Sequence, residues 1–190
     1  MGLVYPIGKN IMNERQAQKR IRTTETILTA AKELIHENGF NRLSLRAVAA
    51  RAGFSPASLY EYFTGKDDII DALCVQIDRN WSEHLRTSDT IPKLMLGYVH
   101  FGLNAPDDFQ LLYQRAMLPD QEEHIPKLFA ERMTVHKFEL DVSIEVALQT
   151  MWALVHGIVL LSLHRDMNVD DHEIMVRKTW NGLLKSEYRQ

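Results

Sequence analysis

The chain has 190 residues, of which 45% are apolar, so it can build one sizeable core or a small domain beside a larger one. Its single cysteine, Cys74, excludes an internal disulfide and fits a reducing cytoplasm. The longest apolar stretch, residues 155–163, is too short to span a bilayer, which takes about 20 residues. The first residues show no signal peptide, and we therefore expect a cytoplasmic protein.

Charge is distributed unevenly along the chain. Residues 1–66 hold ten Lys or Arg and five Asp or Glu, a net charge of +5, whereas residues 67–190 hold twelve and twenty, a net charge of −8. A basic end on an acidic body suggests that the basic end binds a polyanion. An incidental distribution of solvated charges is the alternative interpretation.

The spacing of apolar residues is helical throughout, and no stretch alternates apolar and polar residues with a period of two. We therefore predict an all-α fold of about nine helices. Residues 1–22 are expected to form a flexible arm that ends in a basic cluster at 19–22. The first helix is predicted to begin at Thr23 or Thr24 and to close at Gly39 in the left-handed conformation.

Two short helices follow, separated by a tight turn. Ser44 is the expected N-cap of the second helix, and Gly53 ends it after about two turns. Ser55 is the expected N-cap of the third helix, with Pro56 at its first position, and this helix runs to about Tyr62. Two short helices joined by a glycine turn are typical of a helix-turn-helix, whose second helix enters the major groove of DNA.

The rest of the chain is predicted to be helical in longer segments. A fourth helix has Asp67 and Asp68 in its first turn, where the helix dipole favours them. The remaining helices are expected at about 91–103, 106–117, 124–140, 143–164 and 170–185. Asp170 and Glu173 have the spacing of a capping box at the start of the last helix.

The run from Gly39 to Lys66 resembles the DNA-binding head of the TetR/AcrR family of regulators. The matching pieces are Gly39-Phe40, Leu45-Arg46-x-Val48-Ala49, Ala52-Gly53-Phe54-Ser55, Leu59-Tyr60, Phe63 and Lys66-Asp67. The strong match covers residues 24–73, and the remainder fits by length and helix order. Leu43 departs from the Thr of many members, and Glu61-Tyr62 lies where members vary with their operators.

This resemblance implies a helix-turn-helix DNA-binding domain at 23–66 and a ligand-binding and dimerisation domain at 67–190. The implied DNA contacts are Ser44, Arg46, Ser55, Pro56, Ala57, Ser58, Tyr60, Tyr62 and Lys66. Arg46 would pair with a guanine or a phosphate, and Ser58 would contact a base or a phosphate. The two tyrosine hydroxyls and Lys66 would bind phosphates, Lys66 at the N-terminus of the fourth helix.

Each of these residues also has a purely structural interpretation. Tyr60 is flanked by core residues and could itself be core. Arg46 and Lys66 could be solvated charges, and Ser44 and Ser55 could only cap their helices. The basic cluster at 19–22 could add phosphate or minor-groove contacts, or none.

The C-terminal part also resembles a known piece of the family. Trp152, His156 and Gly157 in TMWALVHGIVLL are similar to the Trp-His-Gly signature of one class of TetR C-terminal domain. A cavity for a small, largely apolar effector is expected, and its candidate walls are Tyr98, Phe101, Phe109, Tyr113, Met117, Phe129, Met133, Trp152 and His156. The alternative is ordinary core packing, with His156 as a satisfied core histidine.

The helix around residues 153–163 is nearly apolar all round, which indicates burial on more than one side. We expect it to pack on its own subunit and on a partner, together with the last helix. Two helices from each subunit would form a four-helix isologous interface. The candidate interface residues are Gly157, Leu160, Leu161, Val176, Trp180, Leu183 and Leu184.

The sequence therefore predicts a homodimeric, sequence-specific transcriptional regulator, a repressor released from a palindromic operator by a small effector. No cofactor or metal is expected. An enzyme is the main alternative of a different class, but the eight histidines are scattered and no phosphate loop or nucleophile elbow occurs. A nucleoid-type protein that coats DNA without sequence choice is the other alternative, and it is disfavoured by the acidic body.

Overall fold

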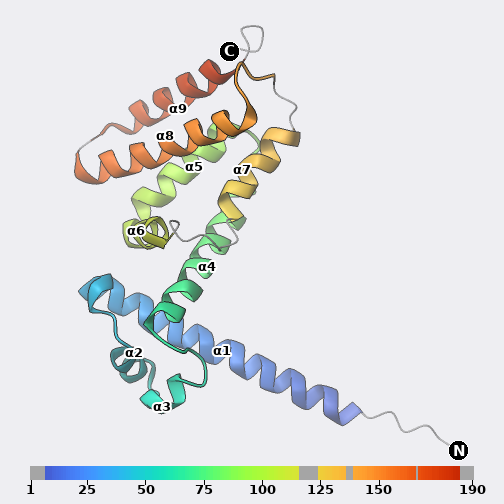
Figure 1. Cartoon of the computed structure of the whole chain (residues 1–190), viewed down its shortest axis with the longest axis vertical. Helices are drawn as coiled ribbons and strands as arrows, with labels where there is room; N and C mark the ends of the chain where they lie inside the picture. Colours follow the sequence, from blue (N-terminus) through green and yellow to red (C-terminus); the bar gives the residue numbers. More distant parts are fainter. Residues whose placement is uncertain (1–6, 116–123, 136–138, 166, 185–190) are drawn as a thin grey trace, which may run out of the picture. The chain divides into compact units, whose positions relative to one another are not determined.

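The structure, a computed structural model, describes residues 7–115, 124–135, 139–165 and 167–184. Every named element in these ranges is a helix, so the predicted all-α fold is confirmed (Figure 1). The chain divides into two compact units, an N-terminal unit (Met1–Leu73) and a C-terminal unit (Cys74–Gln190). The boundary lies inside α4 (Lys66–Leu85), a little beyond the division expected at residue 66.

The N-terminal unit contains α1 (Ile7–Asn38), the 3-10 helix η1 (Phe40–Arg42), α2 (Leu45–Ala52), α3 (Pro56–Leu59) and the first part of α4 (Lys66–Leu85). Its core contains small and branched side chains from α1, α2, α3 and the start of α4. The fully buried members are Ile27, Ala31, Val48, Ala49, Leu59, Ile69 and Ile70. Helix α2 packs against α1 and α3 against α2. Apolar surface removed from water stabilises such contacts by about 25 cal/mol per Å².

The first helix begins at Ile7, well before the expected start at Thr23 or Thr24. Within the described part of the chain, residues 7–22 are therefore helical, and the prediction of a flexible arm over this stretch was wrong. The side chains of residues 14–22 are exposed, so this part of α1 buries no apolar face. The prediction relied on an apolar stripe, whereas the Glu, Arg, Gln, Ala and Lys residues here favour a helix by intrinsic propensity.

Local capping sets both ends of α2 and the start of α3 as the sequence predicts. The Ser44 hydroxyl accepts a hydrogen bond from the Ala47 N–H at 3.2 Å, and Gly53 ends α2 in the left-handed conformation at φ 76° and ψ 25°. The Ser55 hydroxyl accepts from the Ser58 N–H at 3.1 Å. Helix α3 ends at Leu59, earlier than expected, and the chain continues in a turn.

Gly39 has a positive φ of 77°, as predicted, but its ψ of 157° differs from the left-handed helical value. The chain therefore leaves α1 in an extended conformation that favours glycine, and it enters η1 directly. This short 3-10 turn was not predicted.

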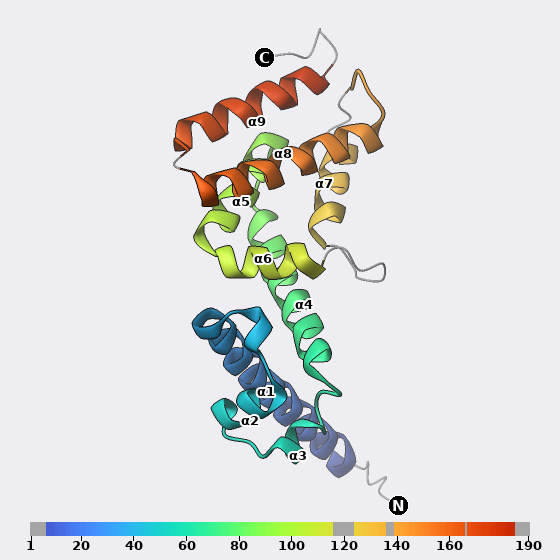
Figure 2. The same ribbon diagram turned by 60° about the vertical axis from the view of Figure 1, so that its left-hand side comes forward.

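The C-terminal unit contains α5 (Ile91–Asn104), α6 (Pro106–Arg115), α7 (His124–Val135), α8 (Ile144–His164) and α9 (Val169–Leu183), besides the end of α4. Helices α8 and α9 lie side by side, and both pack on α5 (Figure 2). Helix α5 contributes Leu94, Met95, Tyr98 and Val99 to the core, and α8 contributes Met151, Val155, Ile158 and Val159. The crossing of α5 and α8 is close, because a Cβ placed on Gly102 would lie 2.7 Å from a Val159 methyl carbon.

Two helix ends in this unit differ from the predictions. The described part of α7 ends at Val135, whereas a helix to about residue 140 was expected. Helix α9 begins at Val169 with Asn168 as its N-cap, whose side-chain oxygen accepts from the Asp170 N–H at 3.1 Å. The predicted capping box of Asp170 and Glu173 is therefore wrong, because an earlier residue satisfies the free N–H groups.

Among the described helices, α8 alone is long and apolar enough to cross a membrane by length and composition. Its side chains Ala147, Met151, Val155, Ile158 and Val159 are buried in the core of the C-terminal unit. A third of its most apolar stretch is buried in this way. The helix therefore serves as a core helix on one side and leaves an apolar surface on the other.

Candidate DNA-binding and ligand-binding sites

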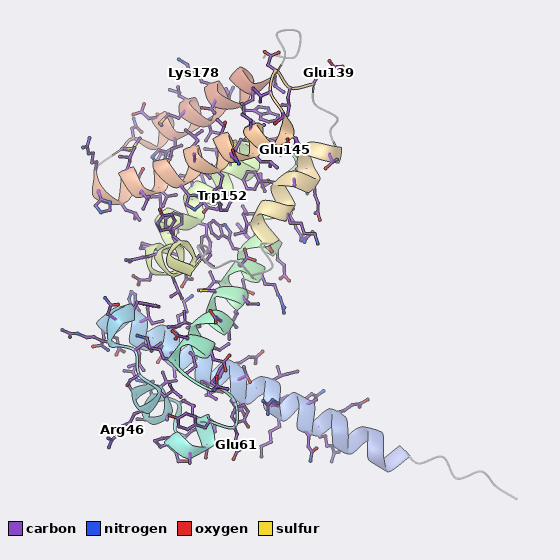
Figure 3. All side chains as sticks on the ribbon, viewed as in Figure 1. Arg46, Glu61, Glu139, Glu145, Trp152 and Lys178 are labelled. Carbon is purple, nitrogen blue, oxygen red and sulfur yellow. The ribbon has the colours of Figure 1, made fainter. Side chains whose placement is uncertain are left out.

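All nine predicted DNA-contact residues lie in the N-terminal unit. They belong to the start of α2, to α3, to the turn that follows α3 and to the start of α4. Those exposed to solvent are Ser44, Arg46, Ser55, Pro56, Ala57 and Tyr60, and those half-buried are Ser58, Tyr62 and Lys66. Figure 3 shows Arg46 projecting outward from α2. Within the described residues Arg46 makes no ion pair, so its guanidinium is free to bind an anion or a base edge.

Tyr60 is 60% exposed, whereas its neighbours Leu59 and Phe63 are buried. The alternative that Tyr60 is a core residue is therefore wrong. A tyrosine that exposes most of its ring can bring its hydroxyl to a phosphate oxygen without unfolding the turn.

The serines have the capping role that was the alternative interpretation, and they retain hydrogen-bonding capacity. Ser44 and Ser55 each accept one backbone N–H, and the hydroxyls of Ser55 and Ser58 are 2.8 Å apart. A hydroxyl that accepts one bond can still donate another. Capping and DNA contact are therefore compatible at Ser44 and Ser55.

Lys66 is the first residue of α4, and its Nζ lies 5.0 Å from the centre of the Phe40 ring. A cation at a helix N-terminus is unfavourable toward the dipole, so it adds to the positive potential that attracts an anion. The adjacent Asp68 carboxylate accepts the N–H and hydroxyl of Thr64 at 2.9 and 3.2 Å, which fixes the turn into α4.

Helix α2 is attached to α1 by an ion pair that positions the helix-turn-helix. Arg51 donates to both carboxylate oxygens of Glu37, at 2.9 and 2.6 Å, and to Glu33 at 3.2 Å. The hydrogen bond from Arg51 holds the pKa of Glu37 below its usual value. This arginine is therefore saturated by its own unit, in contrast to Arg46.

Arg20 was singled out by sequence only as part of a basic cluster, and the structure gives it definite contacts. Its guanidinium donates to the Glu61 carbonyl oxygen at 3.3 Å and lies 5.1 Å from the centre of the Tyr62 ring. Cation–π contact and hydrogen bonding together join α1 to the turn after α3. No local sequence signal connects residues 41 positions apart, so this contact could not be foreseen.

In the C-terminal unit most of the predicted ligand-binding residues meet in one aromatic cluster. Tyr98 contacts Trp152 and Phe109 edge-on, at ring distances of 5.2 and 6.1 Å, and Figure 3 shows Trp152 on α8. Tyr113 and Phe129 join it through His156 and Trp152. Phe101 and Met133 belong to the same core, and Met117 lies outside the described residues.

His156 is hydrogen-bonded at both ring nitrogens. Its Nδ1 lies 3.1 Å from the Trp152 carbonyl oxygen, which can only accept, so Nδ1 carries the proton. The Tyr98 hydroxyl then donates to Nε2 at 2.9 Å. Burial lowers the pKa of His156 and raises that of Tyr98, so both groups stay neutral near pH 7.

Trp81 on α4 belongs to this cluster and was not among the predicted ligand-binding residues. Its ring stacks on Tyr98 and Phe101, at centroid distances of 4.3 and 4.0 Å. The indole N–H is buried and makes no hydrogen bond with any described group. A buried donor without a partner costs about 1–3 kcal/mol, which marks this atom as a position where an acceptor would be bound favourably.

A hollow of about 520 Å³ lies elsewhere in the C-terminal unit, between the start of α5 and α9. Its walls are Thr90, Ile91, Pro92, Lys93, Leu96, Glu173, Val176, Arg177, Trp180, Asn181 and Leu184. None of the predicted ligand-binding residues lines it. Among the described residues, Tyr98, Phe109, Tyr113, Phe129, Trp152 and His156 contact one another in the aromatic cluster.

The predicted dimer residues divide into two groups. Leu160 and Leu161 on α8 are 37% and 45% exposed, and a Cβ on Gly157 would meet open space. Val176, Trp180, Leu183 and Leu184 are instead buried in the core of their own unit, so placing them on an intersubunit surface was wrong. Helix α9 has the apolar face that its sequence predicts, but this face packs on α5 of the same unit.

Comparison with known proteins connects the N-terminal unit to one family. Residues 27–73 match the family described as bacterial regulatory proteins, tetR family. The transcriptional regulator UidR of Escherichia coli K12 is 39% identical over 54 residues, which are 28% of this chain and 28% of UidR. The nucleoid occlusion factor SlmA of Salmonella dublin is 29% identical over 119 residues, which are 58% of this chain and 60% of SlmA.

Solved structures share the fold over most of the chain. The TetR-family regulator HI0893 of Haemophilus influenzae superposes with a TM-score of 0.64 at 17% identity, covering 88% of this chain and 100% of that one. SmeT, a repressor from Stenotrophomonas maltophilia, gives 0.59 at 18% identity, covering 86% and 91%. Residues 27–73 are therefore similar to the tetR family of bacterial regulatory proteins, and the chain has a fold that TetR-family regulators share.

Proposed function

We propose that the protein is a cytoplasmic, sequence-specific DNA-binding transcriptional regulator rather than an enzyme, and that it acts as a homodimer. The observation that carries this proposal is the exposure of Arg46 and Tyr60 around a short capped helix, within the segment matched to the tetR family. Arg46 makes no ion pair with any residue that the structure describes. Such a helix fits the major groove, where base edges are distinguishable.

Within this unit, different residues are proposed to contact bases and phosphates. Arg46 and Ser58 are the candidates for base contact, because a guanidinium pairs with guanine and a hydroxyl with several base edges. Tyr60, Tyr62 and Lys66 are the candidates for phosphate contact, which sets position and orientation. Phosphate contacts contribute affinity on any sequence, and the base contacts select the operator.

The dimer is proposed to form through the outer face of α8. Val146, Leu160 and Leu161 are exposed on it, and Ala153 and Gly157 lie between them at helical spacing. Small residues allow two α8 helices to approach closely, and the leucines would bury apolar surface there. A two-fold dimer presents two recognition helices about 34–36 Å apart and requires a palindromic operator.

The effector is proposed to be small and largely apolar and to bind at the aromatic cluster. The ring centres of Trp152 and His156 are 4.5 Å apart, and this contact supports assigning the unit to the Trp-His-Gly class. His156 and Tyr98 satisfy each other and are neutral, so the cluster offers no charge to a ligand. The free Trp81 N–H favours a ligand that carries one hydrogen-bond acceptor.

Release from DNA is proposed to pass through α4. This helix begins at Lys66 in the N-terminal unit and carries Trp81 in the C-terminal unit. A ligand that binds Trp81 better in one arrangement of the units shifts the population toward that arrangement. If that arrangement spaces the two heads wrongly for the operator, the ligand releases DNA, and the protein is a repressor.

Selection of bound duplexes from a random-sequence pool tests the DNA-binding proposal. The expected product is a palindrome whose half-sites are centred about 10 base pairs apart or a multiple of this. The variant Arg46→Ala is expected to lose preference at one position in each half-site, with the rest of the motif kept. A pool that remains random after several rounds contradicts the proposal.

A second candidate is a DNA-bound factor of the nucleoid that does not act on particular promoters. One observation favours it, namely that the similarity to SlmA covers more of this chain than the similarity to UidR does. Mapping of bound sites across the chromosome separates the two functions. A few sites at promoters support the regulator, whereas many sites away from promoters support the nucleoid factor.

A further inference from the structure

The N-terminal part of α1 carries three basic side chains on one face. Arg15, Lys19 and Arg22 are spaced at i, i+4 and i+7, which places them in a row along the helix. All three are exposed, and together with Gln18, Thr23 and Thr26 they line one shallow polar hollow. We call Arg15, Lys19 and Arg22 the basic face.

The charges of the basic face are not neutralised by the described part of the protein. None of its three side chains makes an ion pair with any described residue. Within residues 14–22 the only carboxylate is Glu14. The basic face therefore differs from Arg51, whose charge is balanced by Glu37 and Glu33 in the same unit.

The position of this segment is fixed relative to the helix-turn-helix. Arg20 lies between the members of the basic face in sequence, and it is held by the Glu61 carbonyl and the Tyr62 ring. Glu61 and Tyr62 directly follow Tyr60, the exposed candidate for phosphate contact. Figure 1 shows α1 continuing past α2 and α3 toward the N-terminus.

We infer that the basic face is a second DNA-binding surface, which binds phosphates flanking the site read by α2 and α3. This inference rests on the proposed function. From Arg15 to Arg22 the helix rises about 10 Å, which is about three phosphate-to-phosphate steps of one strand along the DNA axis. The partner is duplex DNA rather than a lipid surface, because residues 14–22 hold only two apolar side chains, Ala17 and Ile21, and no apolar stripe.

This surface adds affinity without reading bases. Long side chains on a helix lying along the backbone neutralise phosphates and release counterions, which makes binding steeply dependent on salt. Arg20 acts as a positioning residue, because its own charge is engaged with Glu61 and Tyr62. The inference therefore assigns to residues 15–22 a longer footprint on DNA than the helix-turn-helix alone provides.

The test is a full-length triple variant, Arg15→Gln, Lys19→Gln and Arg22→Gln, in which glutamine keeps the helix propensity. Its binding to a duplex selected from a random pool is measured by fluorescence anisotropy over a salt series. The slope of log affinity against log salt is expected to fall by about 2–3 per protomer, and affinity at near-physiological salt by about tenfold or more. The preferred bases are expected to stay the same. Circular dichroism checks that the helix content is kept.

A matched control removes three exposed basic residues of the C-terminal unit, Lys127→Gln, Arg165→Gln and Lys178→Gln, and is expected to leave the slope unchanged. In a second experiment the flanks of the duplex are shortened, which should weaken DNA binding by the wild type and leave binding by the triple variant unchanged.

Specific binding by the wild type with an unchanged salt slope in the triple variant overturns the inference and leaves the proposed function intact. Absence of any specific binding by the wild type refutes the proposed function itself. If single substitutions such as Arg15→Gln keep the fold where the triple variant loses it, a slope change of about 0.9 for each decides the question.

Discussion

Tyr60 and Tyr62 are two positions apart, and their environments differ. Tyr60 exposes its ring to solvent, whereas the Tyr62 ring is half-buried with the Arg20 guanidinium over it. Their types and spacing are visible in the sequence, but this difference depends on a contact with α1. The exposed Tyr60 is therefore the sharper test of phosphate binding.

The variant Tyr60→Phe removes one hydroxyl and keeps the ring. We expect binding to weaken by about tenfold on specific and random DNA alike, since a hydrogen bond to a charged phosphate is lost. Anisotropy with both duplexes measures this effect. The control is Tyr113→Phe, the exposed tyrosine of α6, which should leave DNA affinity unchanged. Equal affinities for wild type and Tyr60→Phe would remove Tyr60 from the contact surface.

Lys66 at the start of α4 carries a charge, so its loss should change the salt dependence of DNA binding. The variant Lys66→Ala is expected to lower the salt slope of DNA binding by about 0.9 per protomer, with the base preference kept. A salt series of anisotropy titrations measures the slope. If the slope stays at the wild-type value, the Nζ of Lys66 is engaged only with the Phe40 ring.

The buried histidines predict how stability depends on pH. Burial lowers the pKa of His156 in the folded protein, so the unfolded chain, with a pKa of about 6.5, binds the proton first as pH falls. The free energy of unfolding should therefore decrease as the pH drops below about 6.5 and should be flat above it. His172 has a pKa shift in the same direction, also from burial.

Thermal unfolding between about pH 7.5 and 5.5 measures this dependence. The variant His156→Gln is expected to flatten the decrease of Tm in part, and the double variant with His172→Gln to flatten it further. Parallel pH profiles for wild type and both variants would show that the pKa of neither histidine is lowered in the folded state.

At the scale of elements, sequence predicts best where the signal is local. The caps at Ser44 and Ser55 and the left-handed Gly53 are confirmed because each depends on neighbours within a few residues. The early start of α1 was missed because no apolar face marks residues 7–22. The direction of the apolar face of α9 was missed because a stripe of Val176, Trp180 and Leu183 fits an intersubunit contact and a core contact equally well.

The candidate site shows the same division. Exposure of Arg46 and the nearness of α2, α3 and the start of α4 follow from the helix-turn-helix pattern. The clamp from Arg20 to Tyr62 and the participation of Trp81 depend on tertiary packing. The sequence pattern does not reveal that the Trp81 N–H lacks a partner among the described groups.

The crossing of α5 and α8 predicts a coupled pair of substitutions. A Cβ at Gly102 would lie 2.7 and 2.8 Å from the two methyl carbons of Val159, so Gly102→Ala should destabilise the protein by about 1–3 kcal/mol. Shortening Val159 to Ala makes room, and the double variant should lose less than the two single variants added together. Urea denaturation measures the three free energies.

The control for this pair is Gly182→Ala, because a Cβ there meets nothing within 4 Å. Its stability should match or slightly exceed that of the wild type. Additive losses from Gly102→Ala and Val159→Ala would mean that α5 and α8 do not meet at this point.

At the scale of the whole molecule, the proposed dimer uses the exposed side of α8 and spares α9. A charge at Leu184 would enter the core of the protomer, so the informative position is Leu160, which is 37% exposed. Leu160→Glu is expected to yield folded monomers, detected by light scattering, with DNA affinity reduced because two half-sites are no longer bound together.

The matched control is Val75→Glu, at a residue of α4 with 40% exposure, which should remain dimeric. If Leu160→Glu also remains dimeric at low micromolar concentration, the subunits associate through another surface. If light scattering shows that the wild type and both variants are all monomeric, the proposal of a dimer on a palindromic operator is contradicted.

The central claim is that this protein recognises a particular DNA sequence. The most direct measurement is fluorescence anisotropy of the purified protein on the DNA just upstream of its own gene and on a scrambled duplex of the same composition, at near-physiological salt. The proposed regulator should bind the upstream DNA tighter by a factor of about 10³ or more. Equal and weak binding to the two duplexes, together with no enrichment from a random pool, would contradict the claim.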